Sequence, residues 1–214
     1  MVNHTEKMQS SNKMRKLTKE FYQRSDVLKV AKELLGKILV TNWNGVITSG
    51  RIIEVEAYAG INDMASHARG GRRTARNEIM YAAGGMAYVY LCYGIHHLVN
   101  VVTHTKETPH AVLIRAIEPV KGIELMLKRT GKKKSDNTLT RGPGNVSKAL
   151  GIFTSHSGHS LVSKQFYIAD DGFVFSKNEI GSSPRIGVDY AGTDAHLPYR
   201  FYVKANPYVS GKPK

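Results

Sequence analysis

Cysteine is almost absent from this chain of 214 residues, since Cys92 is the only one. A disulfide within the chain is therefore excluded, which is usual for proteins of reducing compartments. A chain of this length buries roughly 70% of its unfolded surface, so its core needs no support from a disulfide or a metal. No base neighbours Cys92 in sequence, and we interpret it as a buried, unreactive side chain.

Long apolar runs are also lacking. No stretch approaches the roughly 18 apolar residues of a membrane span, and the polar start of the chain carries no secretion signal. We expect no membrane partner and an intracellular location, cytoplasmic or with the nucleoid in a bacterium. The spacings HExxH, CxxC and GxxxxGK[ST] are missing too. We therefore expect no metal and no cofactor.

Acidic residues are outnumbered almost two to one. The chain has 31 Lys and Arg against 17 Asp and Glu, a net charge of +14. Such a chain attracts polyanions, nucleic acid first and acidic lipid second. No basic amphipathic helix with a broad apolar face stands out, which favours nucleic acid over lipid. The alternative is a generally basic, solvated surface without a polyanionic partner.

Turn signals and apolar periodicity predict one mixed α+β domain, without repeats or a long linker. We expect a flexible tail over 1–16, a domain over 17–210 and a second tail over 211–214. Short turns join most of the strands, so we expect a curved, mainly antiparallel sheet with surrounding helices. The sequence predicts helices at 25–36, 74–83, 120–130 and after the Gly-Pro-Gly turn at 142–144, and strands at 37–41, 46–60, 87–92, 97–103, 110–117, 165–169 and 200–204.

The segment IIEVEAY, residues 52–58, carries two carboxylates on one strand. Strand alternation places Glu54, Glu56 and Tyr58 on the same face. Two like charges at this spacing repel each other, so one interpretation is a solvated edge of the sheet. The other is a general base beside an aromatic wall. A carboxylate can activate water against a glycosidic carbon and stabilise the oxocarbenium-like state of that reaction.

A base of this kind needs an orienting partner, and Arg115 is the best candidate. It ends the apolar run VLIR at 112–115, and a buried arginine is rare unless it is paired. The alternative is an arginine at a strand end that reaches solvent.

The stretch MAYVYLCYGIHHLVNVVT, residues 86–103, is rich in aromatic rings. Alternation puts Tyr88, Tyr90 and Cys92 on one face, and the Tyr93-Gly94 break predicts a hairpin with Tyr93 near its tip. An exposed ring at a tip can wedge into a base stack, and a ring in a pocket, such as Tyr90 or Tyr58, can sandwich an extruded base. The alternative is that these tyrosines pack in the core with their hydroxyls hydrogen-bonded.

Three long, co-linear segments resemble the alkyladenine (3-methyladenine) or methylpurine DNA glycosylase family, of the monofunctional type. They are GRIIEVEAYAGINDMASHARGGRRTARNEIMYAAGGMAYVYLCYGIHHLVNVV, AVLIRAIEP and RIGVDYAGTDAHLPYRFYVKANPYVS. The likeness runs from about Phe21 to Ser210. It implies a protruding hairpin that enters DNA. It also implies hydrolytic excision of damaged purines such as 3-methyladenine, 7-methylguanine, hypoxanthine or ethenoadenine, without a metal or a lysine Schiff base.

The resemblance also implies catalytic roles. Glu56 matches the glutamate that activates water, and Arg115 matches the arginine that holds that glutamate and the water. Glu54 matches the neighbouring acid and is not expected to be the base. The main-chain carbonyl of Ile186 is expected to face the water.

Further matches concern the DNA base. Tyr58, His67 and Tyr90 match the pocket that stacks on and reads the flipped base, with part of the reading done by the main-chain N–H of His67. Asn100 matches a pocket-floor residue that helps exclude normal guanine. Tyr93 matches the hairpin residue that fills the gap left in the duplex.

Contacts with the DNA backbone are expected from Arg72, His96, Gly144 and Lys148. The N–H groups after the Gly-Pro-Gly turn suit a phosphate at a helix N-terminus. Asn145 stands where the family carries a lysine, which weakens this grip or shifts it to Lys148. The partner implied is double-stranded DNA containing damaged purines, bound by a monomer. Two alternatives remain: a non-catalytic nucleic-acid-binding relative, and a bifunctional glycosylase and lyase with an amine in its pocket.

Overall fold

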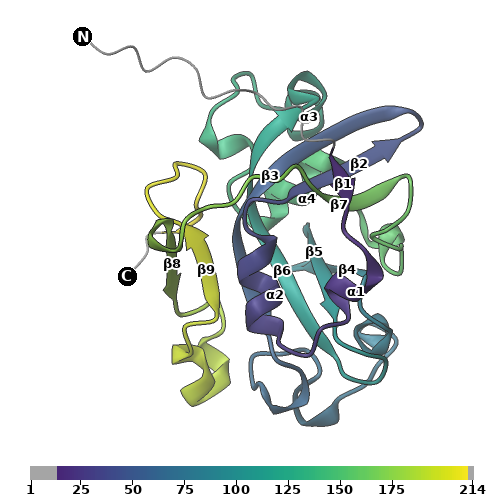
Figure 1. The fold of residues 1–214 in the computed structure, drawn as a ribbon, viewed down its shortest axis with the longest axis vertical. Helices are drawn as coiled ribbons and strands as arrows, with labels where there is room; N and C mark the ends of the chain where they lie inside the picture. The colour runs from purple at the N-terminus through teal and green to yellow at the C-terminus, as the bar shows by residue number, and fades with distance from the viewer. Residues whose placement is uncertain (1–13, 212–214) are drawn as a thin grey trace.

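The computed structural model describes residues 14–211 and confirms an α+β domain built on one antiparallel sheet (Figure 1). Within this range the sheet has nine strands. Seven of them follow the order β1-β7-β2-β3-β6-β5-β4, and β9 pairs with both β3 and β8. The strands are β1 (Arg15–Lys16), β2 (Ile38–Trp43), β3 (Val46–Tyr58), β4 (Ala87–Cys92), β5 (His96–Thr103), β6 (His110–Lys121), β7 (Phe166–Asp170), β8 (Ile180–Ser183) and β9 (Arg200–Val203). The α-helices are α1 (Lys19–Tyr22), α2 (Val27–Leu34), α3 (Ile123–Thr130) and α4 (Pro143–Leu150).

The ends of the chain fall mostly outside the described residues. Positions 1–13 of the predicted tail and positions 212–214 lie there. Arg15 and Lys16, also assigned to the tail, instead form β1 and pair with Asp170 and Ala169 of β7. The sheet therefore begins two residues before the predicted start of the domain. None of the helices within 14–211 is long and apolar enough to cross a membrane.

Strand β3 is the centre of the sheet, since it pairs with β2, β6 and β9. Its pairing with β6 changes register between Ser49 and Gly50. A Cβ atom at Gly50 would lie only 2.6 Å from Cδ1 of Ile117, so the close approach of β6 requires glycine there. Further register shifts surround Glu54 and turn this part of β3 toward β9 as well as β6.

Strand β6 is longer than predicted. We placed its end at Ile117, before Glu118-Pro119, but it continues to Lys121. Pro119 lies opposite Gly50, at the irregular pairing, where a missing N–H donor is tolerated. The following helix α3 consequently begins at Ile123 rather than Val120, after Gly122 with φ 79°.

The predicted helix at 74–83 is wrong. Only Glu78–Tyr81 is helical, as a short 3-10 turn. The side chain of Asn77 explains the loop before it. Its Oδ1 accepts from the N–H of Thr74 at 2.7 Å, and its Nδ2 donates to the carbonyls of His67 and Arg72 at 3.0 and 2.9 Å. These local bonds offer the backbone an alternative to a helix.

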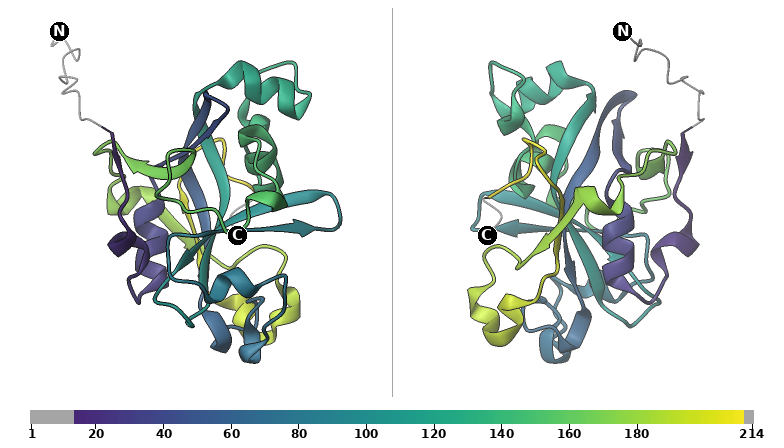
Figure 2. Two further views of the ribbon diagram at one scale, coloured as in Figure 1. Left: turned by 90° about the vertical axis from the view of Figure 1, so that its right-hand side faces the viewer. Right: turned by 60° about the vertical axis from the view of Figure 1, so that its left-hand side comes forward.

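Helices α2 and α4 cover the central strands. Asp26 caps α2 by accepting from the N–H of Lys29 at 2.9 Å, and its apolar stripe contacts β3 and β6. Helix α4 contacts β5 and β6. Buried residues of both helices belong to the main core together with Ile52, Val55 and Ile114. The hairpin β4–β5 extends away from this body, as the left view of Figure 2 shows.

Candidate active site

A cavity of about 800 Å³ opens where the hairpin leaves the body. Its walls come from β3, β4, β5 and β6, from the loops around residue 65 and after β8, and from the start of α4. Ten of the predicted site residues line it: Glu56, Tyr58, His67, Tyr90, Tyr93, His96, Asn100, Arg115, Gly144 and Ile186. Arg72 and Lys148 are exposed and lie outside its lining.

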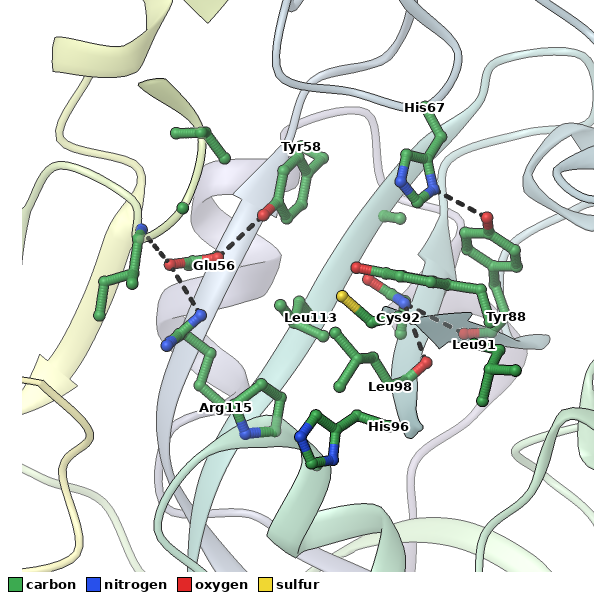
Figure 3. Close-up of a pocket in the computed structure, with 18 of the residues that line it drawn as sticks. Glu56, Tyr58, His67, Tyr88, Leu91, Cys92, His96, Leu98, Leu113 and Arg115 are labelled. Atoms are coloured by element: carbon green, nitrogen blue, oxygen red, sulfur yellow. Dashed lines mark hydrogen bonds and ion pairs between the residues drawn. The ribbon is translucent and has the colours of Figure 1, made fainter. Parts of the chain in front are cut away.

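Glu56 is fully buried, yet its carboxylate forms part of the cavity wall. Its Oε1 accepts from the main-chain N–H of Ile186 at 2.8 Å and lies 3.2 Å from Nη1 of Arg115 (Figure 3). Its Oε2 accepts from the Tyr58 hydroxyl at 2.9 Å. Ile186 thus contacts the carboxylate through its N–H, whereas the family resemblance implies a role for its carbonyl.

Glu54 is also fully buried, so the interpretation of a solvated sheet edge is wrong. Its Oε1 accepts from Nε of Arg115 at 3.0 Å, from Nε of Arg200 at 2.7 Å and from the Ser210 hydroxyl at 2.9 Å. Its Oε2 accepts from the main-chain N–H of Ser210 at 2.6 Å. The two carboxylates therefore differ: Glu54 accepts four hydrogen bonds and lies outside the cavity lining, whereas Glu56 is part of that lining.

Arg115 is buried between these two carboxylates and contacts both of them. This agrees with the expectation that a buried arginine is paired. Burial opposes its charge, but Glu56 and Glu54 outweigh that cost and raise the pKa of Arg115 above its ordinary value. It stays cationic and balances the repulsion between two neighbouring anions. The interpretation of an arginine that reaches solvent is wrong, because the residue is only 7% exposed.

Aromatic rings form another part of the wall. Tyr58 lies beside Glu56 on β3, and Tyr88 and Tyr90 of β4 lie 5.5 Å apart between ring centroids. Burial, and then the charge of Glu56, raises the pKa of Tyr58 well above its ordinary value. Its hydroxyl stays protonated and donates to Glu56. The ring of Tyr88 was not among the predicted site residues, although alternation with Tyr90 would have found it.

His67 closes the cavity on the side opposite Arg115 (Figure 3). Its Nδ1 lies 2.8 Å from the Tyr88 hydroxyl, and its ring meets Tyr90 edge to face at 4.6 Å. Burial, and then the positive charge of Arg76, lowers the pKa of His67 to about 4. The imidazole is therefore neutral near pH 7. Asn100, also on the wall, is fixed by a bond from its Nδ2 to the Tyr88 carbonyl at 3.1 Å.

A buried ion pair supports the loop that carries Ile186. Arg185 donates to both carboxylate oxygens of Asp63, at 2.5 and 2.8 Å, and its guanidinium lies 4.8 Å from the Tyr58 ring. Its partner is 122 residues away in sequence, so no local pattern could have revealed it. The pair fixes the backbone whose next N–H holds Glu56.

The hairpin tip is strongly exposed, as predicted for the Tyr93-Gly94 break. Tyr93 is 89% exposed with φ 50°, and Gly94 follows with φ 73°. Ile95, which the sequence interpretation passed over, is 70% exposed beside it. An aromatic and an aliphatic side chain thus stand together at the end of β4.

The start of α4 forms the end of the cavity nearest His96. A Cβ atom at Gly144 would lie 2.9 Å from Nδ1 of His96, so a larger residue there would displace the exposed imidazole. Asn145 uses its side chain within the loop, donating to the carbonyl of Arg141 at 2.9 Å. It is therefore not extended toward a ligand as a lysine at that position could be.

Metal ligands are not clustered in the described part of the chain, where no group of three or more His, Cys, Asp or Glu side chains is arranged to hold an ion. The cavity lining instead includes a fixed carboxylate, an arginine, four tyrosines with raised pKa values and a neutral histidine. These groups suit proton transfer and the stacking of a flat ligand.

Comparison with known proteins agrees with this arrangement. The family model described as methylpurine-DNA glycosylase (MPG) matches residues 20–207. A protein of Bacillus cereus strain G9842, named "Putative 3-methyladenine DNA glycosylase", is 48% identical over 200 residues, covering 90% of this chain and 97% of its own. A protein of the same name from Chlamydia abortus is 49% identical over 186 residues, covering 86% of this chain and 96% of its own. The chain therefore belongs to the methylpurine-DNA glycosylase family.

Proposed function

We propose that this protein removes alkylated or deaminated purines from duplex DNA by flipping them into the cavity and hydrolysing the N-glycosidic bond. Family membership makes it a DNA glycosylase, a hydrolase of N-glycosyl bonds that acts in DNA repair. The finer assignment, to a glutamate-activated water and to damaged purines, rests on one observation above all. A fully buried carboxylate, Glu56, is held by an arginine in the wall of an aromatic cavity.

The two oxygens of Glu56 have different tasks in this proposal. Oε1 is occupied by Ile186 and Arg115, which fix the plane of the carboxylate. Oε2 has one hydrogen bond within the described part of the chain, from Tyr58, and retains capacity to accept a proton from water. A water held there attacks the anomeric carbon as the bond to the base lengthens. The carboxylate charge also stabilises the oxocarbenium-like state.

Recognition begins with charge. The net charge of +14 attracts the duplex, and Tyr93 at the exposed tip fills the place of the nucleotide that rotates out. A damaged or mispaired base costs less to extrude, which supplies part of the selectivity. Tyr58 and Tyr90 then stack on the base. A cationic, alkylated purine gains a cation–π contribution of about 1–2 kcal/mol from such rings and is also a better leaving group.

The remaining contacts of the predicted site fit the DNA strand and the base edge. We expect Gly144, near the start of α4, and His96, at the start of β5, to approach a phosphate, with Lys148 and Arg72 on the exposed surface beyond the cavity lining. His67 and Asn100 read the edge of the base. We also propose that the protein acts as a monomer.

A lyase step through a Schiff base needs an amine in the cavity. None of the residues that line it, all within 14–211, is a lysine. We therefore propose a monofunctional enzyme that leaves an abasic site. A pure DNA-binding relative would not need a buried carboxylate and arginine facing the cavity.

The test is base release from duplex oligonucleotides that carry 7-methylguanine, hypoxanthine, ethenoadenine or undamaged adenine. Cleavage at the damaged site only after alkali, with no borohydride-trapped adduct, is expected of the monofunctional enzyme. Release from no damaged duplex would remove the proposed function. Cleavage without alkali, together with a trapped adduct, would make it a lyase.

A further inference from the structure

Ser210 lies far from the base pocket in sequence and outside the cavity lining, yet its hydroxyl touches the arginine that holds Glu56. Nη2 of Arg115 donates to Oγ of Ser210 at 3.1 Å, and Oγ donates to Oε1 of Glu54 at 2.9 Å. The residue is 7% exposed, so water cannot readily replace these bonds. It belongs to the segment that follows β9.

Each nitrogen of the Arg115 guanidinium meets a different residue. Nε donates to Glu54 at 3.0 Å, Nη1 lies 3.2 Å from Glu56, and Nη2 donates to Ser210. These three partners together restrict the orientation of the guanidinium. The hydrogen bonds to Glu54 and Ser210 thus help to set the direction in which Nη1 points toward Glu56.

Arg200 extends the same network. It donates through Nε to Glu54 at 2.7 Å and through Nη2 to the main-chain carbonyl of Ser210. The main-chain N–H of Ser210 donates to the second oxygen of Glu54 at 2.6 Å. The backbone of Ser210 is therefore held independently of its side chain. A change at the hydroxyl alone leaves these main-chain bonds in place.

We infer that Ser210 is a positioning residue for the proposed hydrolysis, and that it acts through Arg115 on Glu56. This inference rests on the proposed function of the cavity. Without the hydroxyl, Nη2 of Arg115 loses its hydrogen-bond acceptor in a buried site. The guanidinium then rotates until Nη2 finds another acceptor. Nη1 then moves relative to Glu56, and a small misplacement of a catalytic group slows chemistry much more than it weakens binding.

Ser183 provides a matched control. It is 4% exposed, and its hydroxyl accepts from Nη1 of Arg200 at 3.2 Å. It therefore belongs to the same buried network but does not contact Arg115. Ser183→Ala and Ser210→Ala each remove one buried hydroxyl from the surroundings of Glu54, and only the second removes a partner of Arg115.

The experiment measures single-turnover base release and Kd on one lesion duplex for the wild type, Ser210→Ala, Ser210→Thr and Ser183→Ala. We expect Ser210→Ala to slow release about tenfold or more with Kd nearly unchanged. Tm should fall to a similar extent in Ser210→Ala and Ser183→Ala, since each removes a buried acceptor of an arginine N–H. Ser210→Thr, which keeps an Oγ, should recover most of the rate, and Ser183→Ala should release base at the wild-type rate.

Wild-type release by Ser210→Ala, equal slowing by Ser183→Ala, or a loss confined to Kd would each overturn the inference. The proposed function is judged separately, by the wild type and Glu56→Gln in the same assay. If the wild type releases no base, the function and the inference both fall. If it does, and Glu56→Gln does not, the Ser210 variants decide the inference alone.

Discussion

Arg115 touches both carboxylates of the strand segment EVE, lying 3.0 Å from Glu54 through Nε and 3.2 Å from Glu56 through Nη1. Together with Arg200, which also pairs with Glu54, it allows two buried anions to stand two residues apart. A planar, forked guanidinium can serve both at once, whereas an ammonium is a point charge without that fork.

Arg115→Lys is therefore expected to slow base release by roughly tenfold or more, because charge is kept and orientation is lost. The measurement is single-turnover release on a lesion duplex. Arg51→Lys is the control, since Arg51 also forms a two-pronged pair, with Asp171, that lies outside the cavity. Equal rates for Arg115→Lys and the wild type would show that the fork does not matter.

The hairpin tip can be tested by removing one ring. Tyr93→Ser should weaken binding to a lesion duplex by about 1–3 kcal/mol, the range for loss of base–aromatic stacking. Because Tyr93 is 89% exposed, the fold should not change. Val174→Ser is the control, as another exposed apolar side chain, at 74%, outside the cavity lining. If both variants bind as tightly as the wild type, Tyr93 is not the wedge.

Stability should depend on pH through buried histidines. Burial, and then the neighbouring His104, lowers the pKa of His110 to about 4, while Asp63 partly opposes this shift. In the unfolded chain the ordinary pKa is about 6.5. The unfolded state therefore binds more protons as pH falls from about 6.5 to about 4, and the free energy of unfolding decreases over that window.

His110→Gln removes one of these groups. Its Tm should fall less steeply between pH 7 and pH 5 than that of the wild type, while a smaller slope remains because His67 behaves in the same way. Parallel Tm curves for the two proteins would contradict the role of His110.

Binding to DNA should be sensitive to salt. Each phosphate contacted adds about −0.9 to the slope of log K against log[salt]. Arg72→Ala and Lys148→Ala should each reduce the steepness by about 0.9 if these exposed residues meet phosphates. Lys204→Ala serves as the control, because Lys204 bonds the carbonyl of Asn178 outside the cavity. Slopes that stay at the wild-type value would remove Arg72 and Lys148 from the footprint.

The sequence predicted well wherever the signal was local. Alternation along β4 and the Tyr93-Gly94 break located the hairpin, and the apolar run before Arg115 suggested that this arginine is paired. Prediction from the sequence failed where residues far apart in the chain determine whether a side chain is buried. Glu54 and Glu56 could not be called buried until Arg115, Arg200 and Ser210 were assembled around them.

Two local predictions failed for a different reason. The helix expected at 74–83 gave way to side-chain bonds from Asn77, and the strand expected to end before Pro119 continued because Gly50 faces it. In both cases a propensity was overridden by a contact that the sequence pattern does not encode. The ion pair between Asp63 and Arg185, which are 122 residues apart, is likewise a contact that no local sequence pattern encodes.

The central claim is that Glu56 directs water in a cavity that binds a flipped base. The most direct test compares the wild type and Glu56→Gln for both lesion-duplex affinity and single-turnover release. We expect retained affinity and a loss of turnover of roughly 100-fold or more, the scale of a general base. Release by Glu56→Gln at close to the wild-type rate would contradict the claim and remove Glu56 from the mechanism.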